Sequence, residues 1–198
     1  MFTGIIDHCG ILSHIEPIPG GLHLKINTQF THLELGESIA INGICLTVTD
    51  FQDNTFGCDI SPETLKITTA DQFKIGQELN LERSLLPTTR MGGHFVMGHV
   101  DQMAEVMAIT MINDFIELKL GKIDPENKKF IAKKGSIGIN GVSLTINEVT
   151  ADGFTVMLIP HTLQRTNLNT LQKNDLVNIE FDMLARMVTK HLESLTNE

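Results

Sequence analysis

The sequence contains one twelve-residue stretch twice, 98 residues apart. SIAINGICLTVT occupies Ser38–Thr49 and SIGINGVSLTIN occupies Ser136–Asn147, and seven of the twelve positions are identical. Solenoid and propeller repeats recur at about 20–50 residues. A period close to 100 residues is instead the size of a whole domain. The repeat therefore predicts two tandem domains with one fold.

Other segments of the chain follow the same order in both halves. PETL at Pro62–Leu65 matches PHTL at Pro160–Leu163, and GQELNLE before Arg83 matches NDLVNIE before Phe181. Near the start the offset is 94 residues, because TGIID at 3–7 matches MGHVD at 97–101. A difference of four residues in one loop thus separates the halves. We predict domains at residues 1–94 and 95–182.

Each half is expected to consist of short strands. LHLKI, SIAI, CLTVT and ELNLE alternate apolar and polar residues, which is typical of half-buried strands. Asn42-Gly43 lies between two such runs and recurs as Asn140-Gly141, and this dipeptide favours a tight hairpin. Several strands at this spacing predict an all-β fold with a small closed barrel in each half, because closure leaves no exposed strand edge.

The tail differs from the two halves. Residues 183–198 place apolar side chains along one face of a helix, namely Leu184, Met187, Val188, His191, Leu192 and Leu195. This narrow stripe could pack on the preceding barrel or meet copies of itself in an oligomer. The second interpretation is preferred, because the stripe resembles the seam of a coiled coil.

Composition excludes several classes of function. A net charge of −9 and the lack of Trp and Tyr disfavour nucleic-acid binding, which depends on basic and aromatic side chains. No apolar run approaches the roughly 20 residues that span a membrane, and the first residues do not resemble a signal peptide. Three cysteines, an odd number, indicate free thiols in a reducing compartment. These features predict a cytoplasmic location.

The two halves also share small polar residues, which suggests matched ligand sites. Ser38, Asn42, Thr47 and Thr64 have identical counterparts at the 98-residue offset. Two similar pockets would suit an enzyme that joins two copies of one compound, since fixing two reactants in orientation lowers the barrier by several kcal/mol. Cys45 becomes Ser143 in the second half, so the two copies would be treated differently.

Four segments carry a resemblance to a known family. MFTGII at Met1–Ile6, NGICLTVT at Asn42–Thr49, MGGHFVMGHVD at Met91–Asp101 and GINGVSLTIN at Gly138–Asn147 resemble riboflavin synthase of the alpha-chain type. The resemblance spans nearly the whole chain. It implies two six-stranded antiparallel Greek-key barrels, each binding a lumazine, followed by a C-terminal α-helix that joins three chains into a homotrimer.

The resemblance also implies an activity. Two molecules of 6,7-dimethyl-8-ribityllumazine would exchange a four-carbon unit and yield riboflavin and 5-amino-6-ribitylamino-uracil. Neither a metal nor an organic cofactor is implied. The active site would lie between the N-terminal barrel of one chain and the C-terminal barrel of its neighbour, and association with lumazine synthase is a further expected partnership.

The reaction requires a base for the 7-methyl group of one lumazine and a nucleophile or hydrogen-bond donor for the other. The resemblance places a nucleophile at Cys45 and a proton relay at His99. It assigns Ser38, Ser143 and Asp182 to the same catalytic set. Without the resemblance, Cys45 would be read as a small core residue and Asp182 as the cap of the last helix.

Further residues are expected to bind the substrate through backbone groups, hydroxyls and apolar contacts. They are Gly4, Ile5, Ile6, Leu46, Thr47, Asp59, Ile60, Ser61, Pro62, Glu63, Thr64, Gly98, Val100, Lys134, Leu144, Thr145, Ile159, Pro160, His161, Thr162, Leu163 and Gln164, together with Cys45, His99 and Ser143.

Several positions depart from the family or allow another interpretation. His161, Gln164 and Asn140 stand where acidic residues are expected, which leaves their individual contacts open. His94 and His99 could in principle bind a metal, but no matching ligand pair accompanies them, and His94 is interpreted as a linker residue. Cys9 and Cys58 are read as packing residues.

Two rival functions remain. A lumazine- or flavin-binding fluorescent protein would share the fold without catalysis, and a tandem oligonucleotide-binding barrel would share the architecture. The retention of Cys45, Thr47, His99, Ser143, Thr145 and Asp182 favours the enzyme over the fluorescent protein. The acidic charge argues against the nucleic-acid binder.

Overall fold

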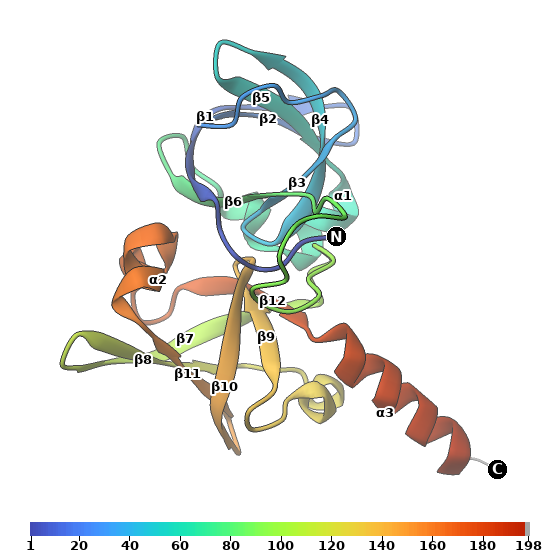
Figure 1. Ribbon diagram of the computed structural model, residues 1–198, viewed down its shortest axis with the longest axis vertical. Helices are drawn as coiled ribbons and strands as arrows, with labels where there is room; N and C mark the ends of the chain where they lie inside the picture. Colours follow the sequence, from blue (N-terminus) through green and yellow to red (C-terminus); the bar gives the residue numbers. More distant parts are fainter. Residues whose placement is uncertain (197–198) are drawn as a thin grey trace.

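The computed structural model describes residues 1–196, with side chains for residues 1–195. Two closed antiparallel barrels of six strands each lie one above the other, and a helix projects from the second barrel (Figure 1). The predicted fold class is confirmed. The domain limits at 94 and 182 stay predictions, and residues 197 and 198 of the predicted tail lie outside the described residues.

The first barrel is formed by residues 8–83. Its strands are β1 (His8–Ile18), β2 (Gly21–Asn27), β3 (Ser38–Ile41), β4 (Ile44–Gln52), β5 (Thr55–Ile60) and β6 (Glu78–Arg83). They are ordered β1-β2-β5-β4-β3-β6 around the barrel, so β2 neighbours β5, as in a Greek key. Two short helical turns, α1 (Pro62–Ile67) and η1 (Thr69–Gln72), connect β5 to β6.

The second barrel repeats this plan with the equivalent strand order. Its elements are β7 (Gln102–Ile112), β8 (Phe115–Gly121), η2 (Pro125–Phe130), β9 (Ser136–Ile139), β10 (Val142–Thr150), β11 (Gly153–Leu158), α2 (Pro160–Arg165), η3 (Asn167–Thr170) and β12 (Leu176–Phe181). Even the irregularities recur, because β4 shifts register between Val48 and Asp50 and β10 between Ile146 and Glu148.

Side-chain alternation explains why these segments form barrel walls. On β4, Ile44, Leu46 and Val48 point into the core while Thr47 and Thr49 are exposed. Each barrel has its own cluster of buried apolar residues, most of which lie on its strands. The two cores are therefore separate, and the barrels meet through other groups.

The barrels meet at the two Asn-Gly hairpins. Gly43 and Gly141 have φ of +78° and +80°, and a Cβ on Gly43 would lie 2.6 Å from the backbone nitrogen of Gly141. Only glycine allows this approach and this φ without strain. The buried Asn80 and Asn178 then cross the interface reciprocally, because each donates its side-chain amide at 2.9 Å to the carbonyl of the opposite hairpin. The contact has an approximate two-fold symmetry.

The segments that lead into the barrels are exchanged. We call residues 3–7 the first arm and residues 97–101 the second arm. Each arm precedes its own barrel in the sequence but also contacts the other barrel. The carbonyl of Gly4 accepts a hydrogen bond from Ser143 of the second barrel, and the carbonyl of Gly98 accepts one from Cys45 of the first. Between the arms, Phe2 and Val96 form an isolated antiparallel bridge. Each half of the chain therefore contributes a segment that packs on the barrel of the other half.

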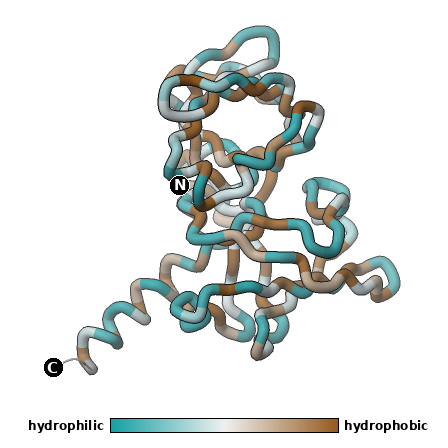
Figure 2. The backbone as a smooth tube through the Cα atoms, turned by 180° about the vertical axis from the view of Figure 1, so that it is seen from behind, coloured by the Kyte–Doolittle hydropathy of each residue, from teal (hydrophilic) through white to brown (hydrophobic). Residues whose placement is uncertain are grey.

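Helix α3 (Met183–Thr196) leaves the second barrel and extends away from both (Figure 1). Figure 2 shows hydrophobic and hydrophilic residues alternating along it. Leu184, Met187, Val188, Leu192 and Leu195 are each more than half exposed. Lys129 on η2 pairs with Glu193 at 2.5 Å and ties the helix to its own barrel. No helix within residues 1–196 is long and apolar enough to cross a membrane.

Candidate active site

The Cys45 site combines the first barrel with the second arm. Cys45 is half-buried near the start of β4, and its backbone N–H donates to the carbonyl of Gly98 at 2.9 Å. Gly98 has φ of +78°, and a Cβ there would lie 2.4 Å from the Cβ of Cys45. A glycine is required for this close approach. The structure thus places the predicted residues Cys45 and Gly98 side by side.

Other predicted residues of this site share one apolar cluster. Val100 of the second arm packs in the first barrel's core with Leu46, Ile60 and Leu65. Val100 thus anchors the second arm in the core of the first barrel. Ser38 and Thr47 are register partners on β3 and β4.

The Ser143 site is built in the same way from the second barrel and the first arm. The backbone N–H of Ser143 donates to the carbonyl of Gly4 at 2.8 Å. Ile6 packs in the second barrel's core with Leu144, Leu158 and Leu163. Thr145 lies opposite Ser136 across β9 and β10, as Thr47 lies opposite Ser38.

Lys134 lies just before β9 in the second half, with φ of +70°. Its backbone N–H donates to the carbonyl of Ile146 at 2.8 Å. The backbone of this predicted ligand-binding lysine is therefore fixed by the barrel.

His94 contacts the predicted site residue Ser143, which the sequence did not reveal. It lies in the linker, as predicted, but its Nδ1 is 2.7 Å from the hydroxyl of Ser143. The ring is buried, and its Nε2 has no hydrogen-bond partner within the described residues. Burial lowers the pKa of His94, and the nearby Asp182 carboxylate opposes this shift. The outcome is a neutral imidazole in contact with a hydroxyl.

Asp182 joins the second barrel to α3. Its carboxylate accepts a hydrogen bond from the backbone N–H of Leu184 at 2.9 Å, which is the helix-capping role considered from the sequence. Its charge also acts on His94. This electrostatic effect indicates that Asp182 lies near His94, the residue that contacts Ser143.

Two buried glutamates hold the arms. The carboxylate of Glu180 on β12 accepts backbone hydrogen bonds from Met97 at 2.5 Å, Gly98 at 2.9 Å and His99 at 3.1 Å. Glu82 on β6 accepts from the backbone and hydroxyl of Thr3, both at 2.6 Å, and from the backbone of Gly4 at 2.9 Å. The two glutamates occupy matching positions in the repeat, as the last residues of GQELNLE and NDLVNIE. This match is the sequence signal from which a shared role of the two residues could have been predicted.

Each arm borders a cavity. His99 and Glu180 line one of about 800 Å³ between the second barrel and α3, with Phe130 and Met187. Ile5 and Glu82 line one of about 840 Å³ beside Arg83 and Leu86. These volumes suit a small organic ligand.

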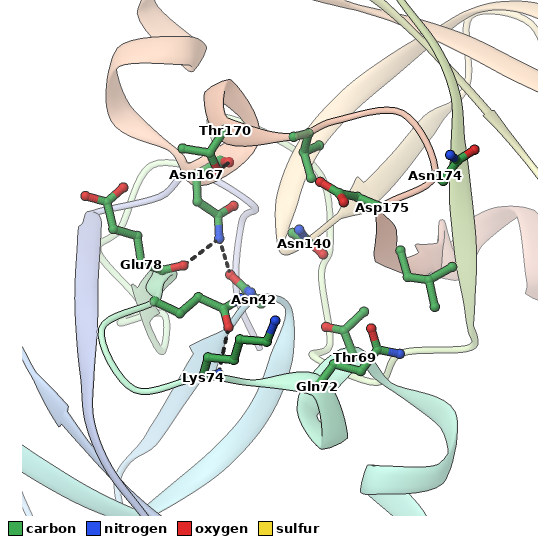
Figure 3. A pocket seen from close by; sticks show the side chains of 13 residues that line it. Asn42, Thr69, Gln72, Lys74, Glu78, Asn140, Asn167, Thr170, Asn174 and Asp175 are labelled. Atoms are coloured by element: carbon green, nitrogen blue, oxygen red, sulfur yellow. Dashed lines mark hydrogen bonds between the residues drawn. The ribbon is translucent and has the colours of Figure 1, made fainter.

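A polar cavity of about 690 Å³ lies between the barrels (Figure 3). There, Asn167 donates its side-chain amide to the side-chain oxygen of Asn42 at 2.9 Å. The residues that line it include none of the predicted site residues.

The two predicted ligand-gripping turns differ from one another. Ser61 caps α1 by accepting a hydrogen bond from the backbone of Thr64 at 3.2 Å, whereas Ile159 at the matching position has no side chain that can cap α2. The carboxylate of Asp59 forms a hydrogen bond of 2.7 Å with Nδ1 of His23. Within residues 1–196, no three His, Cys, Asp or Glu side chains are placed to hold a metal ion.

Comparisons with known proteins agree with this architecture. The family model described as "Lumazine binding domain" matches the chain twice, at residues 3–84 and 97–182. The riboflavin synthase of Bacillus subtilis is 42% identical over 194 residues, which is 97% of this chain and 90% of that protein. The riboflavin synthase of Photobacterium phosphoreum is 40% identical over 97% of this chain and 89% of its own length.

A solved structure shows the same arrangement. The crystal structure of LumP complexed with riboflavin superposes with a TM-score of 0.83 at 28% identity, covering 91% of this chain and 99% of that chain. The family model thus matches both halves of the chain, and the two riboflavin synthases align with it over nearly its whole length. The chain belongs to the riboflavin synthase family and is built from two lumazine-binding domains.

Proposed function

We propose that the protein is a riboflavin synthase, a transferase that converts two molecules of 6,7-dimethyl-8-ribityllumazine into riboflavin and 5-amino-6-ribitylamino-uracil. The observation that carries this proposal is the pair of sites with one plan and different chemistry. Each site is made of one barrel and the arm that precedes the other barrel in the sequence. One site contains Cys45, whereas the other contains the hydrogen-bonded pair of Ser143 and His94.

The Ser143 site fits the lumazine that gives up a proton. A buried, neutral imidazole can accept a proton through the Ser143 hydroxyl at 2.7 Å. The 7-methyl group of the lumazine is the carbon acid, because its carbanion is delocalised into the ring. Asp182 lies close enough to stabilise the imidazolium that would form.

The Cys45 site fits the acceptor lumazine. The Cys45 thiol can add to the electron-poor ring as a nucleophile, and His99 on the second arm can move protons there. Gly98 supports the Cys45 backbone. The remaining predicted substrate-binding residues would hold the ribityl chains and ring edges. They lie on the arms, on β4 and β10, on the turns at 59–64 and 159–164, and, for Lys134, just before β9.

The decisive experiment is turnover without additives. The purified protein is mixed with 6,7-dimethyl-8-ribityllumazine in the presence of a chelator, and riboflavin is followed by absorbance. We expect one riboflavin for each two lumazines consumed. Binding without consumption would instead support the rival interpretation as a lumazine-binding protein that catalyses nothing.

We also propose a homotrimer assembled through α3, which would bring the Cys45 site of one chain to the Ser143 site of another. The support is the apolar stripe of α3, where Leu184, Met187, Val188 and Leu195 are each more than half exposed in a single chain. A cytoplasmic location and association with lumazine synthase stay predictions.

The trimer is tested by sedimentation. Wild-type protein should sediment at three times the mass of the chain. Val188→Glu places a charge in the stripe and should shift the population to monomers, because burying an unpaired charge is costly. Lys190→Gln, off the stripe, is the matched control. A monomeric wild type at micromolar concentration would refute the trimer.

A further inference from the structure

The first half of the second arm, residues 97–99, is held on one side by the buried carboxylate of Glu180. Its carbonyl at Gly98 supports Cys45, and its next residue is His99. On the Glu180 side, three consecutive N–H groups of the arm, from Met97, Gly98 and His99, all point at the carboxylate of Glu180. Glu180 is only 6% exposed, so water does not compete strongly for these bonds.

We propose that Glu180 is a positioning residue for the reaction proposed above: its carboxylate holds the arm that carries His99 against the Cys45 site. Hydrogen bonds to a charged acceptor are about twice as strong as neutral ones. Glu82 holds the first arm in the same way against Ser143, with bonds from Thr3 and Gly4. This inference rests on the proposed function for its kinetic consequences but not for the arm geometry.

The state of Glu180 should depend on pH within the physiological range. Burial raises the pKa of Glu180 to about 7, aided by the Asp101 carboxylate and opposed by the arm N–H groups. The charged and titratable groups that face it are Asp101, His99, Arg186, Lys190 and His191. Above pH 7 the carboxylate can accept all three bonds, whereas below it a proton occupies one oxygen and the arm loosens.

The arm is also connected to α3. Asp101 at the end of the arm accepts the backbone N–H of Phe181 at 2.9 Å and pairs with Arg186 of α3 at 2.6 Å. Glu180 therefore holds the start of the arm, and Asp101 holds its end. The carboxylate that titrates near neutrality acts on the half of the arm that touches Cys45.

The direct test is hydrogen–deuterium exchange on the full-length protein. Glu180→Gln should speed exchange of the amides of Met97, Gly98 and His99 by at least about tenfold, because charge-assisted bonds are lost. Glu82→Gln, the matched variant, should do the same for Thr3 and Gly4 and leave the second arm unchanged. Unaltered exchange of the second arm in Glu180→Gln overturns the proposal.

A pH series separates positioning from general stability. In the wild type, protection of the second-arm amides, corrected for intrinsic exchange, should rise as the pH passes through about 7. His99→Gln should keep this rise and Glu180→Gln should abolish it. A flat wild-type profile contradicts the proposal even if no variant can be purified.

Turnover provides the kinetic readout. Glu180→Gln should form riboflavin about ten- to a hundredfold more slowly while lumazine binding changes less, since small displacements of a reacting group are costly. If the wild type forms no riboflavin, the proposed function fails while the exchange data still decide the role of Glu180. If the wild type turns over and Glu180→Gln matches it, the positioning role fails.

Discussion

His94→Gln is expected to reduce riboflavin formation by about 10²–10⁴-fold, the usual contribution of a positioned proton-transfer group. Glutamine keeps a hydrogen-bonding group near the hydroxyl of Ser143, which His94 contacts at 2.7 Å. It cannot accept a proton near neutral pH, so deprotonation of the 7-methyl group would lose its catalytic base and become slower. Lumazine binding, measured by fluorescence titration, should change by less than about tenfold.

The partner variant makes this prediction specific. Ser143→Ala should reduce the rate to a similar extent, and the double variant His94→Gln/Ser143→Ala should be little slower than either single variant. Such non-additivity is expected of residues that act as one unit. Cys45→Ser, in the other site, should combine with His94→Gln more nearly additively. Two fully additive losses for His94 and Ser143 would show that they do not form one relay.

Gly43→Ala is expected to destabilise the protein by at least about 3 kcal/mol, which corresponds to a fall in Tm of roughly 6–12 °C for a chain of this size. An alanine at this positive φ costs about 1–2 kcal/mol by itself. Its Cβ would also lie 2.6 Å from the backbone nitrogen of Gly141, and backbone cannot move aside as a flexible side chain can. The barrels would be forced apart at their closest contact.

Gly36→Ala is the matched control for this prediction. Gly36 also has a positive φ, +86°, but a Cβ there meets nothing within 4 Å. It should show the conformational cost alone, and the difference in Tm between the two variants measures the contact with Gly141. Equal melting temperatures in a thermal unfolding experiment would mean that the hairpin contact can relax.

The fold could be predicted from the sequence because it is encoded twice. The repeat indicates two domains with one fold. The alternation of apolar and polar residues in stretches such as SIAI and CLTVT indicates strands that bury one face. The Asn-Gly pairs locate the tight turns, and the structure confirms positive φ at Asn42, Gly43, Asn140 and Gly141. These are local signals, so they can be read without knowledge of the tertiary structure.

The site could be predicted only in part, because its main contacts join segments that are far apart in the sequence. Periodicity gave no indication that residues 3–7 would cross to the second barrel or residues 97–101 to the first. The His94–Ser143 contact spans 49 positions and has one end in the linker, outside the repeated segments. Comparison of the two halves could therefore not reveal it. Glu82 and Glu180 occupy matching positions in the repeat, but their burial depends on the tertiary structure and could not be predicted from the sequence.

The exchange of arms has a consequence for how two such sites could become different. Two identical single-barrel chains that swapped arms would form a homodimer, and symmetry would impose every substitution on both sites at once. Covalent fusion removes that constraint. One half can then carry Cys45 and Thr69 where the other carries Ser143 and Asn167. Divergence after fusion is thus a direct route by which a symmetric binder of two equal molecules acquires an unequal division of chemical labour.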